Sequence, residues 1–237
     1  MWGKGDPVRN MEMRTMMHKE TRRNILAYLL LLVTPAFAED NMETPLHNAA
    51  KANDAPKVNS LLATGAKLEA RDSAQRTALM AATRANAIDA ARALIEAGAN
   101  VNARDNIRDT PYLYAAAEDR LEILKMTLNA GANLKDTNRY GGTGLIPAAH
   151  HGYPENVREL LKTDIAIDHV NSLGWTALLE TIILSDGGPT HQNILTQLIE
   201  AGANVNLADG ESVSPLAHAK QRGFTAMIEM LEKAGAR

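Results

Sequence analysis

The segment ALIEAGANVNARD, residues 93–105, returns in altered form along most of the chain. Aligned on a threonine or serine, the first five copies follow at intervals of 33 residues, and the sixth comes after 38. The aligned starts are Thr44-Pro45-Leu46-His47, Thr77-Ala78-Leu79, Thr110-Pro111-Tyr112, Thr143-Gly144-Leu145, Thr176-Ala177-Leu178 and Ser214-Pro215-Leu216. A fixed period of this size predicts a solenoid, in which each repeat buries its apolar face against its neighbours.

Several positions recur at fixed offsets from the threonine or serine, and each has a physical role. The hydroxyl is placed to cap the first helix of a repeat, and the proline that follows it in three copies suits the first helical turn. Nine residues on, we expect a left-handed residue to end this helix, at Asn53, Asn86, Asp119, Gly152 and Gly223. A Gly-Ala pair then ends the second helix, at Gly65, Gly98, Gly131, Gly202 and Gly235.

The second helix of each repeat carries apolar residues at helical spacing, which predicts a stripe buried between repeats. The stripe comprises Val58, Leu61, Leu62, Ala91, Leu94, Ile95, Leu124, Leu128, Val157, Leu160, Leu161, Leu195, Leu198 and Ile199. An Asp or Asn then begins the next hairpin, where its side chain can bond the turn backbone. These residues are Asp72, Asp105, Asn138, Asn171 and Asp209. All of these positions are assigned to the scaffold and none to function.

This pattern of capping threonine, left-handed turn, Gly-Ala stop and hairpin Asp or Asn resembles the ankyrin-repeat family over residues 39–237. The resemblance implies an all-α repeat fold, a single solenoid of six helix–turn–helix units connected by β-hairpin turns. The predicted repeats are 39–71, 72–104, 105–137, 138–170, 171–208 and 209–237.

Three departures from the pattern stand out. Asp164 replaces the glycine that ends the second helix of the fourth repeat, so we expect a distorted outer loop there. The fifth repeat holds five extra residues around LSDGGPTHQN, 184–193, which we interpret as a lengthened turn between its two helices. Glu232 stands where other repeats have a second apolar residue, as expected for the exposed face of a terminal cap.

Residues 1–38 lack the repeat pattern and are predicted to be a secretory signal peptide. Lys19, Arg22 and Arg23 precede an apolar run, 25–33, and the residues 36–38 form an Ala-x-Ala cleavage site. The run is shorter than the roughly 20 residues of a membrane-spanning helix. We therefore expect cleavage after residue 38 and a periplasmic protein of a Gram-negative bacterium, with no membrane span after cleavage. Alternative starts are Met11, Met13, Met16 and Met17.

The charge balance argues against a nucleic-acid partner. Residues 1–38 hold six of the 25 basic residues and three of the 28 acidic residues. The remaining chain therefore has 19 basic and 25 acidic residues and a net charge of −6. Phosphate neutralisation supplies most nucleic-acid affinity, and this chain has no basic stripe to provide it. It also has no cysteine, which removes disulfides, thiolate metal sites and thiol catalysis. We expect a monomer.

The sequence contains no constellation typical of catalysis or metal binding. It lacks a G-x-S-x-G nucleophile motif, an H-E-x-x-H metal motif and a phosphate-binding glycine loop. His150 and His151 are adjacent, and neighbouring residues on a helix point about 100° apart, so the pair is poorly placed to chelate one ion. His47 is expected to bond nearby backbone. We predict no catalytic, cofactor-binding or metal-binding residues, and no cofactor.

The resemblance implies a recognition surface made of the hairpin tips and the exposed faces of the first helices. Aromatic residues and arginine dominate binding hot spots, and the chain has only nine aromatic residues. We predict a protein-binding strip centred on repeats three to five, comprising Arg76, Arg84, Ile107, Arg108, Asp109, Arg139, Tyr140, His150, His151, Leu173 and Trp175. The alternative is that Tyr140 and Trp175 pack against each other or the next repeat and stiffen the hairpins.

These observations predict a non-enzymatic scaffold or adaptor that acts in the periplasm through contacts with another protein. The chain is similar in size and layout to exported bacterial ankyrin proteins linked with periplasmic catalase, which implies support of a partner enzyme such as a catalase in stress resistance. One alternative is an immunity-type inhibitor of a toxin targeted to the periplasm. Another is a metal-binding or hydrolytic protein that uses the histidines and the repeat-five insertion.

Overall fold

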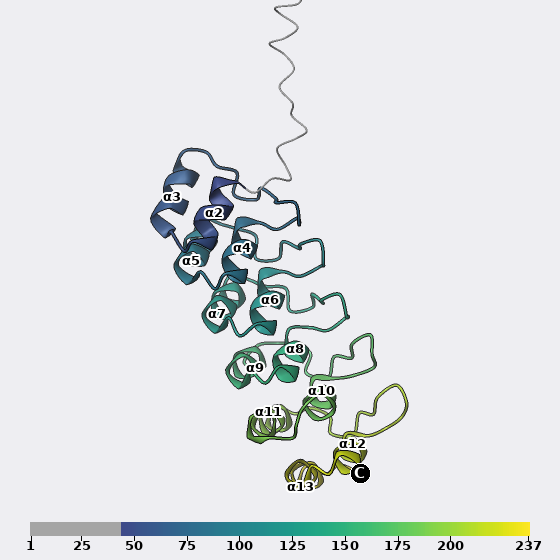
Figure 1. Ribbon diagram of the computed structural model, residues 1–237. Helices are drawn as coiled ribbons and strands as arrows, with labels where there is room; N and C mark the ends of the chain where they lie inside the picture. Colours follow the sequence, from purple (N-terminus) through teal and green to yellow (C-terminus); the bar gives the residue numbers. More distant parts are fainter. Residues whose placement is uncertain (1–43) are drawn as a thin grey trace, which may run out of the picture. The chain divides into compact units, whose positions relative to one another are not determined.

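Helices follow one another in pairs through residues 44–237, the part of the chain that the computed structural model describes. The even-numbered helices form one column beside the hairpins, and the odd-numbered helices form a second column (Figure 1). The pairs are α2 (Pro45–Lys51) and α3 (Ala55–Ala63), α4 (Ala78–Arg84) and α5 (Ile88–Glu96), α6 (Pro111–Ala117) and α7 (Leu121–Asn129), α8 (Leu145–His150) and α9 (Pro154–Leu161), α10 (Ala177–Ile183) and α11 (Pro189–Glu200), and α12 (Pro215–Arg222) and α13 (Thr225–Lys233). The predicted all-α solenoid of six helix pairs is confirmed. The predicted signal peptide, 1–38, lies outside the described residues.

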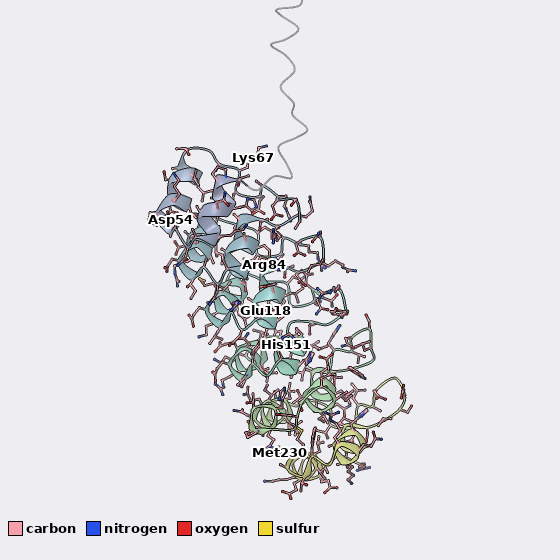
Figure 2. All side chains as sticks on the ribbon, viewed as in Figure 1. Asp54, Lys67, Arg84, Glu118, His151 and Met230 are labelled. Atoms are coloured by element: carbon pink, nitrogen blue, oxygen red, sulfur yellow. The ribbon has the colours of Figure 1, made fainter. Side chains whose placement is uncertain are left out.

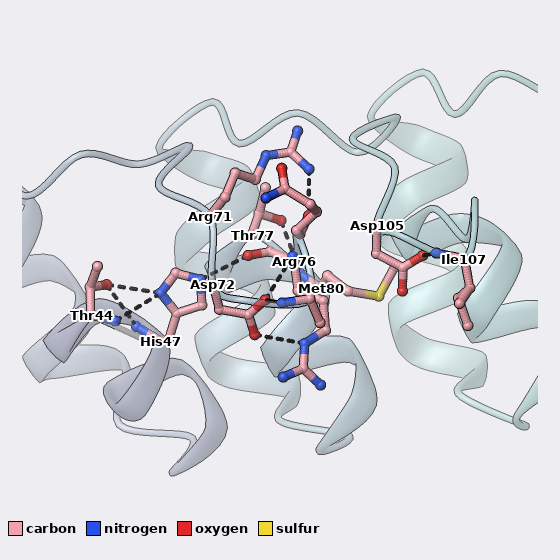
Figure 3. Close-up of polar contacts among 11 residues, drawn as sticks. Thr44, His47, Arg71, Asp72, Arg76, Thr77, Met80, Asp105 and Ile107 are labelled. Atoms are coloured by element: carbon pink, nitrogen blue, oxygen red, sulfur yellow. Dashed lines mark hydrogen bonds and ion pairs between the residues drawn. The ribbon is translucent and has the colours of Figure 1, made fainter. Parts of the chain in front are cut away.

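Hairpin turns connect the pairs, and no residue of 44–237 forms a strand. In each of five hairpins the side chain of the predicted Asp or Asn accepts bonds from the amides two and four residues on. These residues are Asp72, Asp105, Asn138, Asn171 and Asp209. In the first hairpin, His47 Nε2 also donates to the Arg76 carbonyl at 2.9 Å (Figure 3). His47 therefore bonds nearby backbone, as predicted.

Threonine or serine caps the first helix in five of the six repeats. The side-chain oxygen accepts a bond from the amide three residues on at Thr44, Thr77, Thr110, Thr176 and Ser214. These bonds satisfy one of the amides that a helix leaves free at its start. The predicted caps are confirmed at these five positions.

The cap prediction is wrong for the fourth repeat. Thr143 Oγ1 is buried and has no hydrogen-bond partner, and α8 begins only after Gly144. The physical reason is Pro147, which lacks the N–H that bonds the carbonyl of the capping residue in the other repeats. Ile146 N–H bonds the Thr143 carbonyl instead, at 3.2 Å, and Gly144 N–H donates to the hydroxyl of Tyr112 at 3.3 Å.

Left-handed residues separate the two helices of a repeat, as predicted. The φ angles are 55° at Asn53, 53° at Asn86, 53° at Asp119, 78° at Gly152 and 70° at Gly223. The end of the fourth repeat differs from the other stops in one backbone angle. Each glycine of the five Gly-Ala stops has a positive φ, whereas Asp164 does not.

The five extra residues of the fifth repeat are divided between a turn and a helix. In the third repeat the first helix, the turn and the second helix have 7, 3 and 9 residues, and in the fifth they have 7, 5 and 12. The lengthened turn is thus only part of the insertion. The turn packs against the sixth repeat, where Arg222 donates to the Ser185 carbonyl at 2.7 Å. A Cβ at Gly187 would lie 2.6 Å from the ring of Phe224.

The core is a continuous layer between the helices of successive repeats. At least one residue of the predicted stripe is fully buried in each of the first five repeats: Val58, Ala91, Leu94, Leu124, Val157, Leu160, Leu195 and Leu198. The remaining stripe residues are partly buried against this layer. Glu232 is exposed on the last helix and pairs with Lys220 at 2.9 Å. Among the described helices, none has the length and apolar character needed to cross a membrane.

Candidate functional site

A groove of about 570 Å³ lies where the hairpins meet the first helices of repeats two to five. We call it the hairpin groove. Its lining comprises Arg84, Ile107, Asp109, Tyr114, Ala117, Glu118, Asn138, Arg139, Tyr140, Gly142, Ile146, Pro147, His150, His151, Asn171, Leu173, Glu180 and Leu184. Residues from the ends of α4, α6 and α8, such as Arg84, Glu118 and His151, follow one another down the stack (Figure 2).

The hairpin groove brings together eight of the eleven residues predicted to bind a partner. They are Arg84, Ile107, Asp109, Arg139, Tyr140, His150, His151 and Leu173. Repetition explains this convergence, because equivalent positions of successive repeats fall on the same side of a solenoid.

Three predicted residues lie outside this lining. Arg76 is held by its own hairpin, where its Nε donates to Asp72 at 2.7 Å (Figure 3). Arg108 is exposed and occupies a left-handed position of its hairpin, with φ of 71°. Trp175 is half-buried at the base of a hairpin, and its amide and carbonyl both bond Asn171.

Exposed apolar side chains concentrate in the hairpin groove. Among the described residues, five large apolar side chains are exposed, and four of them line it: Ile107 at 39%, Tyr140 at 56%, Leu173 at 58% and Leu184 at 41%. The fifth is Val170, at 46%. Gathering of exposed apolar groups in one concave place is typical of a surface that binds another molecule.

Two arginines lie over aromatic rings of the groove. The guanidinium of Arg84 is 4.5 Å from the ring centre of Tyr114, and that of Arg139 is 4.6 Å from the ring centre of Tyr140. Arg139 also lies 4.0 Å from a carboxylate oxygen of Asp109. These contacts hold the two cations against the walls by cation–π attraction.

Two carboxyl groups of the groove, those of Asp109 and Glu180, sit in an environment that disfavours their charge. Burial raises the pKa of Asp109, and the nearby charge of Asp105 raises it further, while Arg139 and Arg84 act in the opposite direction. Burial also raises the pKa of Glu180, to about 7, against the opposing effect of its hydrogen bond from Asn171. Glu180 is only 5% exposed.

Glu180 and His150, from the neighbouring helices α10 and α8, lie next to each other in the groove. His150 Nδ1 is 3.5 Å from one carboxylate oxygen of Glu180, and Asn171 donates to the other oxygen at 2.7 Å. Burial lowers the pKa of His150, and the nearby His151 and His191 lower it further. The lowered pKa of His150 disfavours its charged form, so this contact is a weaker ion pair than one with arginine or lysine.

The two adjacent histidines do not form a chelating pair. Their ring centres are 4.7 Å apart in an edge-on arrangement, and Nδ1 of His151 bonds the carbonyl of Ala117 at 2.8 Å. Within residues 44–237, no group of three or more His, Asp or Glu side chains is placed to hold a metal ion.

The lining residues that sequence reasoning did not assign to binding include Tyr114, Glu180 and Leu184. Tyr114 and Glu180 each lie four residues after a capping threonine, so this shared register could have revealed them. Leu184 lies eight residues after Thr176 and ends α10, in the register that Glu118 and His151 occupy in the third and fourth repeats. Its position in the groove could therefore also have been read from the repeat.

Comparison with known proteins places the chain among repeat proteins of this kind. The family model described as ankyrin repeats in three copies matches residues 16–105 and 112–209. The putative ankyrin repeat protein YahD of Escherichia coli strain K12 is 44% identical over 81 residues, which are 34% of this chain and 40% of that relative. The match therefore spans less than half of the relative's length.

Solved structures agree with the family match. The crystal structure of an ankyrin repeat domain from Acinetobacter baumannii AYE is similar at 54% identity with a TM-score of 0.79, covering 81% of this chain and 98% of that one. The ankyrin repeat domain of Bcl-3, a member of the IkappaB protein family, is similar at 26% identity with a TM-score of 0.75, covering 83% of this chain and 88% of that one. Because the family model covers most of the sequence and the helix pairs repeat with its period, this chain belongs to the ankyrin-repeat family.

Proposed function

We propose that this protein is a non-enzymatic adaptor of the bacterial periplasm whose hairpin groove holds a segment of a partner protein. Ankyrin repeats generally serve as scaffolds for protein–protein interaction, and membership of this family supports that general role. The observation that carries the proposal is the gathering of four of the five exposed large apolar side chains of the described residues in one groove. Such a groove suits an extended segment with alternating apolar side chains.

The partner can be identified by co-purification. The gene would be expressed from its own start with a C-terminal tag, and proteins captured from the periplasmic fraction would be identified by mass spectrometry. A periplasmic catalase is the first partner to test, because exported ankyrin proteins of this layout are linked with that enzyme. Capture of a secreted toxin instead would support the immunity-type alternative.

Matched variants locate the binding face. We expect the double variant Tyr140→Ala, Leu173→Ala to lose a captured partner, because it removes the two most exposed apolar side chains of the groove. Val170→Ala is the control, since Val170 is similarly exposed but lies outside the groove. Equal capture by the double variant and the control would contradict the assignment of the groove.

Export is tested separately. The proposal requires removal of residues 1–38, so N-terminal sequencing of the protein from the periplasm should begin at residue 39. Retention of the full chain in the cytoplasm would overturn the compartment and, with it, every periplasmic partner.

A further inference from the structure

Glu180 differs in its electrostatic setting from the equivalent residue of the next repeat. Both Glu180 and His218 lie four residues after the cap of a first helix, and each bonds the Asp or Asn that begins its hairpin. In the sixth repeat His218 Nε2 lies 2.7 Å from a carboxylate oxygen of Asp209, so a carboxylate is paired with a histidine there. In the fifth repeat the partner of Glu180 is Asn171, an amide that brings no charge.

His150 is the one basic side chain of the described residues that lies at ion-pair distance from this carboxyl. The two arginines of the lining, Arg84 and Arg139, lie against Tyr114 and Tyr140 and are not ion-paired with Glu180 among the described contacts. His150 is the nearest basic group, at 3.5 Å, and its own burial and histidine neighbours lower its pKa.

Retaining a buried acid without an arginine or lysine partner costs stability, which points to a use in binding. A buried carboxyl raises its pKa to avoid carrying an uncompensated charge, and perturbed groups of this kind cluster at functional sites. One oxygen of Glu180 is occupied by Asn171, while the other, which faces His150, has no hydrogen bond among the described contacts. A donor from a ligand could bond this second oxygen.

The surroundings of Glu180 favour a cationic ligand with an apolar stem. The lining holds three carboxyl groups, Asp109, Glu118 and Glu180, while its two arginines lie over Tyr114 and Tyr140 and are not paired with Glu180. The exposed side chains of Leu173 and Leu184 belong to the same lining and suit the methylene groups of a long side chain.

We propose that the hairpin groove selects a partner segment carrying an arginine or lysine, whose cationic end pairs with Glu180 while its stem packs on Leu173 and Leu184. This inference rests on the proposed function and deepens it, because it names the chemistry that the partner must present. Pairing a buried carboxylate with a cation restores the charge balance that the free protein lacks.

The test uses short blocked peptides as probes of the full-length protein. Acetyl-Leu-Arg-Leu-amide would be titrated against protein labelled with ¹³C at the glutamate carboxyl groups, with the acetyl-Leu-citrulline-Leu-amide peptide as a neutral isostere and acetyl-Leu-Glu-Leu-amide as the anionic probe. We expect the arginine peptide to shift the Glu180 signal and to lower the midpoint of its pH titration. The citrulline peptide should leave this midpoint unchanged, because it presents no positive charge.

Two charge-removing variants complete the test. Glu180→Gln keeps the shape of the side chain and should lower the affinity for the arginine peptide by about ten-fold. This is the factor expected for one charge-assisted hydrogen bond. Glu118→Gln is the matched control on the same lining and should change the affinity by less than about two-fold. Equal binding of the arginine and citrulline peptides, tighter binding of the glutamate peptide, or no arginine-dependent shift at Glu180 would each overturn the proposal.

The outcome separates this inference from the function on which it rests. A captured partner that is lost from the Tyr140→Ala, Leu173→Ala variant but kept by Glu180→Gln would retain the groove as the binding site and overturn the selection of a cation. Loss from both variants, together with the arginine-dependent shift at Glu180, would support both statements.

Discussion

At the scale of single residues, two substitutions in the repeat pattern depend on each other. Tyr112 takes the place of a leucine found in other repeats, and it is completely buried. Its hydroxyl and ring occupy the space beside Gly144, where a Cβ would lie 2.7 Å from the hydroxyl oxygen and 2.9 Å from Cζ. The larger side chain in the third repeat therefore requires the absence of one in the fourth.

This dependence predicts a coupled pair of variants. Gly144→Ala should lower the free energy of unfolding by about 1–3 kcal/mol, because overpacking forces neighbouring atoms apart. In a Tyr112→Leu background the same substitution should cost clearly less, since the clashing ring atoms are gone. Urea unfolding of the four proteins of this cycle gives the coupling, and strictly additive costs would contradict the prediction.

Glu180 makes stability depend on pH. Its pKa is about 7 in the folded chain against a reference of 4.5, so the folded state holds this proton more tightly than the unfolded state. The resulting stabilisation is complete below about pH 4.5 and is lost as the pH rises through about 7. We expect the loss to be about 3 kcal/mol for this buried group.

Comparison with Glu180→Gln isolates this effect. The lowered pKa of His150 has the opposite sign and reduces stability as the pH falls through its titration range, but it is present in both proteins. The difference in unfolding free energy between wild type and variant should therefore decline from about pH 5 to about pH 8. A difference that stays level over this range would show that Glu180 titrates normally.

At the scale of the helix, the fourth repeat shows how a proline can prevent an upstream threonine from capping a helix. Thr143 aligns with the capping residues, yet Pro147 removes the amide that would bond its carbonyl, and the helix begins one residue late. The local pattern of threonine and following residues was sufficient to predict five caps. In the fourth repeat the capping threonine is present, but the proline four residues later prevents the cap. The threonine alone therefore does not predict the start of this helix.

The difference between caps can be measured directly. Thr176→Ala should lower the unfolding free energy by about 1 kcal/mol, because the hydroxyl oxygen accepts from the Leu179 amide at 3.1 Å. Thr143→Val should be neutral or stabilising, because the hydroxyl that it replaces is buried without a partner. A larger loss for Thr143→Val than for Thr176→Ala would contradict this account of α8.

Only part of the groove could be predicted from the sequence. Hairpin tips are recognisable from their offset within the repeat, so Ile107, Tyr140 and Leu173 were found from the sequence. Glu180 was not, because its register could be read from the sequence but its burial and its contacts with Asn171 and His150 are properties of packing. Trp175 was included for its residue type, although its place in the hairpin puts it outside the groove lining.

At the scale of the whole described solenoid, stability comes from contacts between neighbouring repeats. The fifth and sixth repeats are joined by an extra set of contacts, since the insertion meets Arg222 and Phe224. The guanidinium of Arg222 lies 4.9 Å from the ring centre of Phe224, so the two side chains act together. The insertion thus fastens the terminal repeat to the stack.

Removing the contact between the insertion and Phe224 should lower the local stability of the sixth repeat only. Phe224→Ala is expected to speed amide hydrogen exchange in α12 and α13 by about ten-fold or more, because a partly buried aromatic anchor is lost. Exchange in α4 and α5 should stay the same, since each repeat contacts only its neighbours. Uniformly faster exchange along the solenoid would indicate a single cooperative unit instead.

The position of the hairpin groove has a mechanical consequence. Ile107, Tyr140 and Leu173 come from three successive hairpins, so one occupant that touches all three spans the joints between them. Such an occupant works as a splint: it resists any bending that would spread the hairpins apart. Part of its affinity is then set by the elasticity of the stack, and substitutions in the distant apolar layer that alter curvature will tune binding without touching the ligand.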